Sequence, residues 1–302
     1  MPSAVADRMR MLERRVEEAL ASNGLPADAR PGDVARTILE ETLSTVARVR
    51  RTTWRDAAVV LRLFDRDVAP LLRLLYRYWW RVEAVGIDRV PVHGPVLLVA
   101  NRGPGLVAYE PFMVREALAR GLPARAGVRP LLDSWVFEVP VLGRAATRSG
   151  AAAASAALLR RHLGRDEAVV VQPEGSYAFA KAFRARYRLG RFTDGFARVA
   201  IELGTPIVPV AVIGAEEGQP VLARVDSVGR LLGLPTLPIT PTLVPLPTKW
   251  RLHFGDVLDV AATYPAARSR GEGASRLREQ VRERLQGLIL EGLRRRRSVF
   301  LG

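Results

Sequence analysis

Two apolar runs rich in β-branched residues constrain the fold of this 302-residue chain more than any other feature. The first, 169–171, leads into the turn at 172–175, and the second covers 207–213. Continuous runs of this length are typical of strands that are buried on both faces. The segment between them has helical spacing, so the pattern predicts two parallel strands joined by a loop and a helix. Because ligands bind beyond the carboxyl ends of such strands, Glu174 is expected at a ligand site.

A second loop of this kind, from Asn101 to Glu110, follows another continuous apolar run at 96–100. The loop is rich in glycine, and Pro111 then stands where the first turn of a helix tolerates proline. The same order of strand, loop and helix is therefore predicted here. We expect this loop to face Glu174.

The remaining spacing predicts the elements that surround these strands. Helices are expected at 131–137, 151–163 and 275–297, strands within 82–92 and 250–260, and a loop at 140–150. The apolar segment 228–247 carries five prolines, which exclude a helix or a central strand and predict an extended flap.

These elements predict a mixed α/β fold with a central, mostly parallel sheet flanked by helices. Apolar residues at helical spacing before residue 50 predict an N-terminal helical extension, assigned to 1–70, ahead of an α/β domain at 71–302. The amphipathic segment 54–80, which ends in Trp79 and Trp80, has two interpretations. It is either an interfacial membrane helix or a helix that packs on the core with a basic outer face.

Composition limits the possible chemistry. The chain has no cysteine, which excludes disulfides and thiolate catalysis, and its three histidines, His93, His162 and His253, stand singly, so no metal site is expected. The net charge of +15 favours an anionic membrane surface as a partner. No nucleic acid is expected, because the arginines are spread along the chain and no nucleic-acid-binding motif is present. Without a signal peptide or a spanning run, a cytoplasmic protein held peripherally at the inner face of the plasma membrane is expected.

The two loops and the strand at 207–213 occur in an order that resembles the phospholipid/glycerol acyltransferase family. The segment 181–196 is similar to the branch of that family nearest the diacylglycerol acyltransferases, and the resemblance runs from about Leu71 to the C-terminus. It implies transfer of an acyl chain from acyl-CoA or acyl-carrier protein, a co-substrate rather than a cofactor, to the hydroxyl of a lysophospholipid or other glycerolipid. In such enzymes a histidine after the strand asparagine is the general base, and an aspartate follows it.

The resemblance also implies that Glu174 binds the acceptor and that Pro209 shapes the acyl-chain site. Arg148, Lys181 and Arg184 are further candidates for an anionic headgroup or for CoA, and Arg102 beside two glycines is a candidate for phosphate. The expected substrate-binding residues are Asn101, Gly103, Gly105, Pro173, Glu174, Gly175, Lys181, Arg184 and Pro209.

This chain departs from the family pattern at the base. Arg102 occupies the histidine position and Val107 the aspartate position. Because the pKa of arginine is above about 12, Arg102 cannot accept a proton, and a general base contributes about 10² to 10⁴ in rate. Glu110 is the nearest replacement base, but an ion pair with Arg102 is expected and would lower its pKa.

Two functional hypotheses follow. The first is a working O-acyltransferase with a rearranged base. The second is a non-catalytic relative that binds lysophospholipid, acyl-CoA or a partner enzyme at the membrane.

Overall fold

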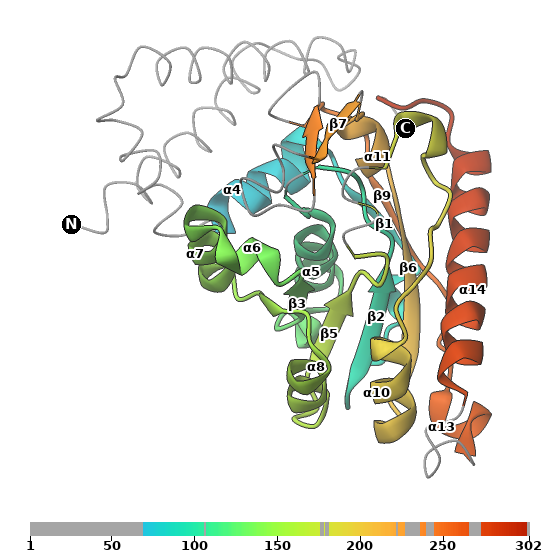
Figure 1. Cartoon of the computed structure of the whole chain (residues 1–302). Helices are drawn as coiled ribbons and strands as arrows, with labels where there is room; N and C mark the ends of the chain where they lie inside the picture. The colour runs from blue at the N-terminus through green and yellow to red at the C-terminus, as the bar shows by residue number, and fades with distance from the viewer. Residues whose placement is uncertain are drawn as a thin grey trace.

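The computed structural model describes residues 69–105, 107–175, 178, 181–221, 223–226, 236–239, 245–265 and 273–300. The helices expected before residue 69 and most of the flap expected at 228–247 lie outside these residues. The described part is built on a seven-stranded sheet in the order β1-β9-β6-β2-β5-β3-β4 (Figure 1). Its strands are β1 (Glu83–Val85), β2 (Val96–Ala100), β3 (Arg129–Leu132), β4 (Ala152–Ala153), β5 (Ala168–Val171), β6 (Ile207–Ile213) and β9 (Arg251–Phe254).

The central strand β2 pairs in parallel with both β5 and β6, which confirms the predicted parallel strands. The helix α10 (Gly195–Leu203) lies between β5 and β6 in the chain, as predicted. Among the described strands of this sheet, β6 and β9 are the one antiparallel pair, because β1 and β9 run against the other strands. The fold is therefore the expected mixed α/β fold with a mostly parallel sheet.

Helices cover both faces of the sheet, which explains why the strand residues are apolar without alternation. Leu98 and Val170 pack in one apolar cluster, whereas Leu97 and Val169 pack in the other. The first cluster includes residues of α4 (Ala69–Leu74), α5 (Glu110–Gly121), α6 (Trp135–Glu138) and α7 (Pro140–Arg148). The second includes residues of α8 (Ala156–Leu163), α10, α13 (Val260–Thr263) and α14 (Ala274–Arg295).

Smaller elements connect these layers. The short helix α11 (Ala215–Gly218) directly follows β6, and β7 (Ala223–Val225) and β8 (Leu237–Ile239) form a separate antiparallel pair. A π-helical turn (Leu75–Trp79) extends α4, and 3-10 turns occur at Ile87–Arg89, Pro123–Arg125 and Phe183–Ala185.

Three local predictions were wrong. The expected loop at 140–150 is mostly α7, because proline suits the first turn and Ala146 faces the core. The helix expected from 131 begins only at Trp135, since Leu131 and Leu132 belong to β3. The helix expected from 151 begins at Ala156, where the Ser155 hydroxyl caps it by accepting from Leu158 N at 3.2 Å.

The paired tryptophans belong to the core. Trp79 is 5% exposed and Trp80 is 0% exposed, and the ring of Trp80 stacks on Trp250 with centroids 4.2 Å apart. Trp79 Nε1 also donates to Pro245 O at 2.8 Å. These contacts favour the core-packing interpretation for the described end of the amphipathic segment, whereas 54–68 lies outside the described residues. None of the described helices has the length and apolar character needed to span a bilayer.

Candidate functional site

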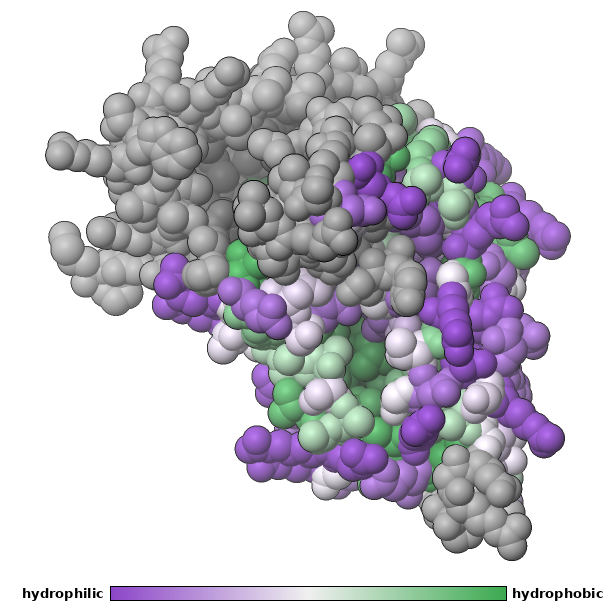
Figure 2. Space-filling view, viewed as in Figure 1, coloured by the Kyte–Doolittle hydropathy of each residue, from purple (hydrophilic) through white to green (hydrophobic). Residues whose placement is uncertain are grey.

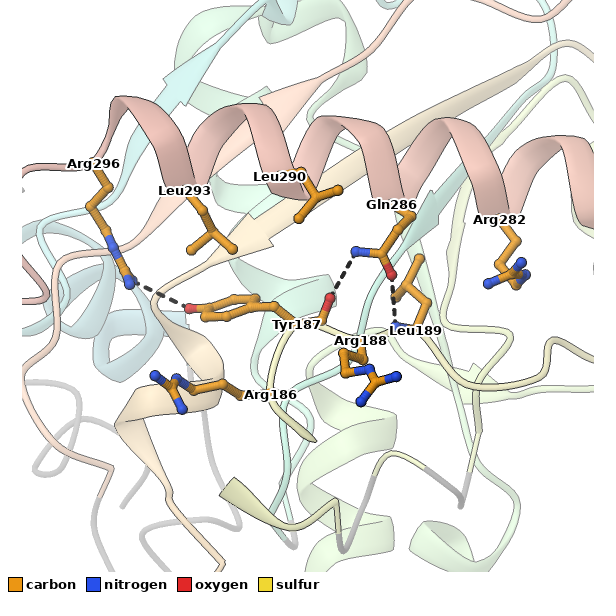
Figure 3. Close-up of a pocket in the computed structure, with 9 residues that line it drawn as sticks. All are labelled: Arg186, Tyr187, Arg188, Leu189, Arg282, Gln286, Leu290, Leu293 and Arg296. Atoms are coloured by element: carbon orange, nitrogen blue, oxygen red, sulfur yellow. Dashed lines mark hydrogen bonds between the residues drawn. The ribbon is translucent and has the colours of Figure 1, made fainter. Parts of the chain in front are cut away.

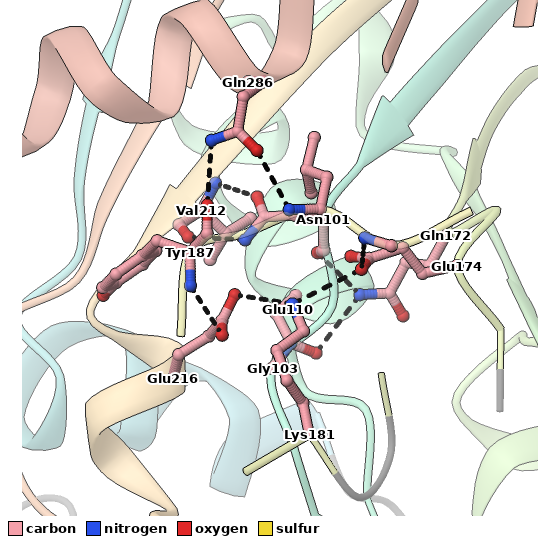
Figure 4. Close-up of polar contacts among 12 residues, drawn as sticks. Asn101, Gly103, Glu110, Gln172, Glu174, Lys181, Tyr187, Val212, Glu216 and Gln286 are labelled. Atoms are coloured by element: carbon pink, nitrogen blue, oxygen red, sulfur yellow. Dashed lines mark hydrogen bonds and ion pairs between the residues drawn. The ribbon is translucent and has the colours of Figure 1, made fainter. Parts of the chain in front are cut away.

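The carboxyl ends of β2, β5 and β6 lead into three loops that meet at one edge of the sheet (Figure 4). Asn101 begins the first loop, and its side chain both donates to Val212 O at 2.9 Å and accepts from Val212 N at 2.7 Å. Gln172 begins the second loop and donates to Asn101 O at 3.0 Å. The amide of Asn101, expected to bind substrate, therefore joins β2 to β6 and fixes the positions of the loops.

Arg102 is 2% exposed and forms an ion pair with Asp133. The hydrogen bond runs from Nη1 to Asp133 Oδ2, and the same Nη1 lies 3.5 Å from Gly175 O. The expected ion pair with Glu110 is wrong, because the guanidinium extends toward the loop after β3. Arg102 thus links three loops as a permanent cation.

Glu110, at the first residue of α5, is 3% exposed. Its Oε1 accepts from Gly103 N at 2.7 Å, and its Oε2 lies 3.4 Å from Gln172 Nε2. Burial raises its pKa, although the backbone amides and Arg102 oppose the shift. Both carboxylate oxygens are engaged, so Glu110 shapes the loop rather than facing a ligand.

Two positions of this loop favour glycine. A Cβ at Gly103 would lie 2.6 Å from Glu110 Oε1, so the Glu110 side chain would have to shift. Gly105 has a φ of +111° and lies against the side chain of Gln219. Both expected substrate-binding glycines therefore have a structural reason for their identity.

Glu174 is 1% exposed and lies in the turn after β5. Its Oε1 accepts from Gly190 N at 2.8 Å and lies 3.3 Å from Lys181 Nζ. Its Oε2 is also buried but accepts no hydrogen bond from any residue that the structure describes. A buried carboxylate oxygen without a donor is costly, so this atom is suited to receive a hydroxyl from a ligand.

The turn that carries Glu174 is fixed by its own backbone. Gly175 N donates to Gln172 O at 3.0 Å, and Thr193 N donates to Pro173 O at 3.1 Å. Pro173 and Gly175, both expected at the site, therefore position Glu174 through the main chain.

Two carboxylates of α11 complete the cluster. Glu216 Oε1 lies 3.2 Å from Lys181 Nζ, and its Oε2 accepts from Tyr187 N at 2.9 Å. Burial raises the pKa of Glu216 to about 7, although Lys181 opposes the shift. Glu217 accepts from the Tyr187 hydroxyl and from Arg296 Nη2, the latter at 2.8 Å.

Sequence reasoning missed Asp133, Glu216, Glu217 and Tyr187. The position of the two glutamates just after the strand at 207–213 was the available signal for them, because the same rule selected Glu174.

The charges of the cluster do not balance if every group is ionised. Its carboxyl groups are Asp133, Glu110, Glu174, Glu216 and Glu217, and its cations are Arg102, Lys181 and Arg296. Five carboxyl groups therefore face three cations. The two whose pKa values burial raises are Glu110 and Glu216, so burial favours the neutral form of these two groups.

Two expected site residues form no hydrogen bond or ion pair with the described carboxylates of the cluster. Arg184 is exposed on the 3-10 turn at Phe183–Ala185. Pro209 is buried in the middle of β6, where it pairs with Val99 and its carbonyl accepts from Gly255 N at 2.8 Å. The nitrogen of Pro209, which carries no hydrogen, therefore faces Gly255 just beyond the end of β9. The β6–β9 pair loses no hydrogen bond at this position.

No histidine takes part in the cluster. His93 precedes β2, at the opposite end of that strand, and His162 Nδ1 lies 2.9 Å from Glu167 Oε2. His253 lies in β9, where its ring approaches Gly292 of α14. Among the described residues, no group of histidine and acidic side chains could hold a metal ion.

Apolar side chains gather in a hollow near the carboxyl end of β5, and hydrophilic side chains lie on either side of it and below it (Figure 2). The site thus combines buried carboxylates with a nearby apolar surface, an arrangement that suits an amphiphilic ligand.

The sequence model of the Acyltransferase family matches residues 112–213. The uncharacterized protein Rv0502 of Mycobacterium tuberculosis is 34% identical over 316 residues, which cover 99% of this chain and 87% of that protein. The chain belongs to the phospholipid/glycerol acyltransferase family. The matched residues include the turn at 172–175 and the strand at 207–213, whereas the loop at 101–105 precedes them.

Two further similarities accompany these. A Gallus gallus protein named "DGAT1/2-independent enzyme synthesizing storage lipids" is 25% identical to this acyltransferase over 180 residues, covering 60% of this chain and 53% of that protein. The crystal structure of the 1-acyl-sn-glycerophosphate acyltransferase PlsC from Thermotoga maritima superposes with a TM-score of 0.48 and 16% identity, over 87% of this chain and 93% of that one.

Proposed function

We propose that this acyltransferase moves an acyl chain from acyl-CoA to a hydroxyl of a lysophospholipid or other glycerolipid, with Glu174 as the general base. The observation that carries the proposal is the buried Oε2 of Glu174, which accepts no hydrogen bond from the described residues. An acceptor hydroxyl would donate to this atom and leave no unsatisfied group. The family supports the reaction, and the free oxygen supports the assignment of the base.

The reaction needs one proton acceptor and one departing thiol. The hydroxyl oxygen attacks the thioester carbonyl carbon, a carbon–oxygen bond forms, and the carbon–sulfur bond breaks. The hydroxyl proton passes to Glu174 Oε2 and then to the leaving thiolate, so that atoms and charge balance. A carboxylate in this position can act as a general base because it is held within reach of the hydroxyl it deprotonates.

Glu174 suits this role better than the two residues of the first loop. Arg102 is a cation paired with Asp133, and both oxygens of Glu110 are engaged at 2.7 and 3.4 Å. Oε1 of Glu174 is fixed by Gly190 N and Lys181, which orients Oε2.

A second candidate is a relative that binds these ligands without turnover. The observation that favours it is the Arg102–Asp133 ion pair, which fills the position of the family's histidine with a group that cannot accept a proton. This candidate keeps the role of Glu174 in binding a hydroxyl and removes the chemical step.

We also place the protein at the cytoplasmic face of the plasma membrane. The net charge of +15 supports this location, because cationic surfaces are attracted to the anionic lipids of that leaflet. Flotation with phosphatidylglycerol vesicles at low salt tests it, and absence of binding would remove it.

The test of function is acyl transfer by the purified chain. Radiolabelled acyl-CoA is incubated with a panel of lysophospholipids and monoacylglycerols, and Glu174→Gln is compared with Glu202→Gln, an exposed glutamate on α10. We expect transfer by the wild type, a loss of about 10² or more for Glu174→Gln, and little change for the control. Ligand binding without transfer to any acceptor would instead support the non-catalytic relative.

A further inference from the structure

A groove of about 670 Å³ lies between α14 and the segment 186–189 (Figure 3). Arg282, Leu290 and Leu293 line it from the helix, and Arg296 lines it from the residue after the helix. The groove is distinct from the Glu174 turn, and its wall at 186–189 belongs to the segment 181–196 that resembles the diacylglycerol acyltransferase branch. Its volume lies within the range of small-molecule sites.

The segment opposite α14 is rigidly held. Gln286 donates from Nε2 to Tyr187 O at 2.8 Å and accepts at Oε1 from Leu189 N at 2.9 Å. Tyr187 and Leu189 are therefore buried, and the residues that alternate with them, Arg186 and Arg188, are exposed. Figure 3 shows both arginines on the side of the segment away from the helix in this view, with their guanidinium groups directed apart.

The groove carries uncompensated positive charge. Arg282 pairs with Glu279, and Arg296 pairs with Glu217. By contrast, Arg186 and Arg188 form no ion pair with any carboxylate that the structure describes; Arg186 lies over the ring of Phe183. Two guanidinium groups are thus available for an anion, and guanidinium is the side-chain group best matched to phosphate.

An apolar wall adjoins these charges. Leu290 is 48% exposed although it belongs to a helix that packs on the core, and Leu293 lies one turn further along the same helix. A ligand that complements the groove therefore carries more than one phosphate together with a flat or apolar group.

The groove and the proposed acceptor site share one wall. Leu189 lines the groove, and the next residue, Gly190, donates its N–H to Glu174 Oε1. Tyr187 likewise lines the groove, while its own N–H donates to Glu216. A ligand in the groove is thus separated from the carboxylate cluster by one backbone segment, 187–190.

We propose that this groove binds the phosphorylated nucleotide head of coenzyme A, an inference that rests on the proposed acyl transfer. The phosphates pair with Arg186 and Arg188, and the adenine covers Leu290. The flexible pantetheine arm then extends around the shared wall toward Glu174. A concave groove suits this small donor, whereas a carrier protein or a bilayer would need a broader surface.

The test measures binding without turnover. Free coenzyme A and pantetheine, which lacks the nucleotide and every phosphate, are titrated calorimetrically into the full chain at one fixed, low ionic strength. The groove variant is Arg186→Gln with Arg188→Gln, and a charge-reversed form with glutamate at both positions is measured in parallel. The control, with the same charge changes, is Arg161 with Arg165, both exposed and near the amino end of β5. Melting temperatures verify that each variant is folded.

We expect the wild type and the control to bind coenzyme A at least about tenfold more tightly than the glutamine groove variant, because two charge-assisted contacts are lost. Charge reversal should weaken binding further, and pantetheine should bind weakly to all proteins. Equal binding of coenzyme A by groove and control variants would overturn the inference, as would equal affinity for coenzyme A and pantetheine. If the groove variant lost binding to phosphatidylglycerol vesicles but bound coenzyme A like the wild type, the groove would instead bind a lipid surface and the inference would be overturned. Acyl transfer by the wild type from acyl-carrier protein but not from acyl-CoA would overturn it in favour of a carrier protein.

The failure of this inference and that of the proposed function are distinguishable. Coenzyme A binding that depends on Arg186 and Arg188, without acyl transfer, would support the groove assignment and contradict the catalytic one. Acyl transfer by the groove variant with an unchanged KM for acyl-CoA would support the catalytic assignment and contradict the groove assignment.

Discussion

Arg102 donates to Asp133 across the site edge of the sheet, so that the family's base position is occupied by half of an ion pair. Arg102 is 2% exposed, and the side chain of Asp133 is 19% exposed. Removing one partner leaves the other charge poorly solvated. We expect Arg102→Met to lower the free energy of unfolding by about 3 kcal/mol, measured by urea denaturation.

The double variant Arg102→Met with Asp133→Asn is the control for this prediction. Because it removes both charges, it should be more stable than Arg102→Met alone, with a coupling energy of at least about 1 kcal/mol in the double-mutant cycle. Strictly additive effects would show that the pair contributes nothing to stability.

Glu110 and Glu174 should respond differently to the same amide substitution. Glu110→Gln keeps an oxygen that accepts from Gly103 N and resembles the protonated carboxyl that burial favours. Its rate of acyl transfer should remain within about threefold of wild type, whereas Glu174→Gln should lose about 10² or more. The measurement is kcat with acyl-CoA at saturating acceptor, and a larger loss in Glu110→Gln than in Glu174→Gln would reassign the base to Glu110.

Glu216 should make stability depend on pH. Burial raises its pKa in the folded protein to about 7, from the ordinary value of 4.5. Between pH 4.5 and about 7, the folded protein therefore keeps a proton on Glu216 that the unfolded chain has lost. This group lowers the free energy of unfolding as pH rises from about 5 to about 8, by up to about 3 kcal/mol. The variant Glu216→Gln does not titrate, so its stability relative to wild type should increase over the same interval.

Urea denaturation across this interval measures the difference, with Glu202→Gln as an exposed control. The loss of the contact with Lys181 adds an offset to Glu216→Gln, but the rise with pH distinguishes the titration from that offset. A difference between Glu216→Gln and wild type that stays constant with pH would show that Glu216 is not protonated at neutral pH in the folded protein.

The sequence was sufficient for the parts of the site that depend on local pattern. The apolar runs at 96–100, 169–171 and 207–213 are strands, and ligand-site residues were expected where they end, which is where Asn101 and Glu174 lie. Glu216 follows the same rule, but its contact with Lys181 joins residues 35 positions apart. Periodicity carries no information on such a pairing.

The partner of Arg102 was not predictable for a related reason. Asp133 follows β3, which pairs with β5 on the side opposite β2. Strand order is set by the packing of the whole sheet, whereas the residue spacing pointed to the nearer acid, Glu110. The amide of Asn101 was likewise expected to meet substrate, because no local pattern shows that it joins β6.

A side chain at Gly103 should be destabilising, because the position of Glu110 depends on this glycine. A Cβ at Gly103 would lie 2.6 Å from Glu110 Oε1, which would have to shift, and 3.2 Å from Ala215 Cβ, a tight contact. Gly103→Ala should therefore lower the free energy of unfolding by about 1 to 3 kcal/mol and reduce acyl transfer, since the displaced Glu110 also contacts Gln172. The matched control is Gly127→Ala, where the added Cβ would meet no atom within 4 Å, and its stability should change by less than about 1 kcal/mol. Urea denaturation and transfer rates of both variants provide the comparison, and equal effects at the two glycines would show that the loop adapts to the added methyl group.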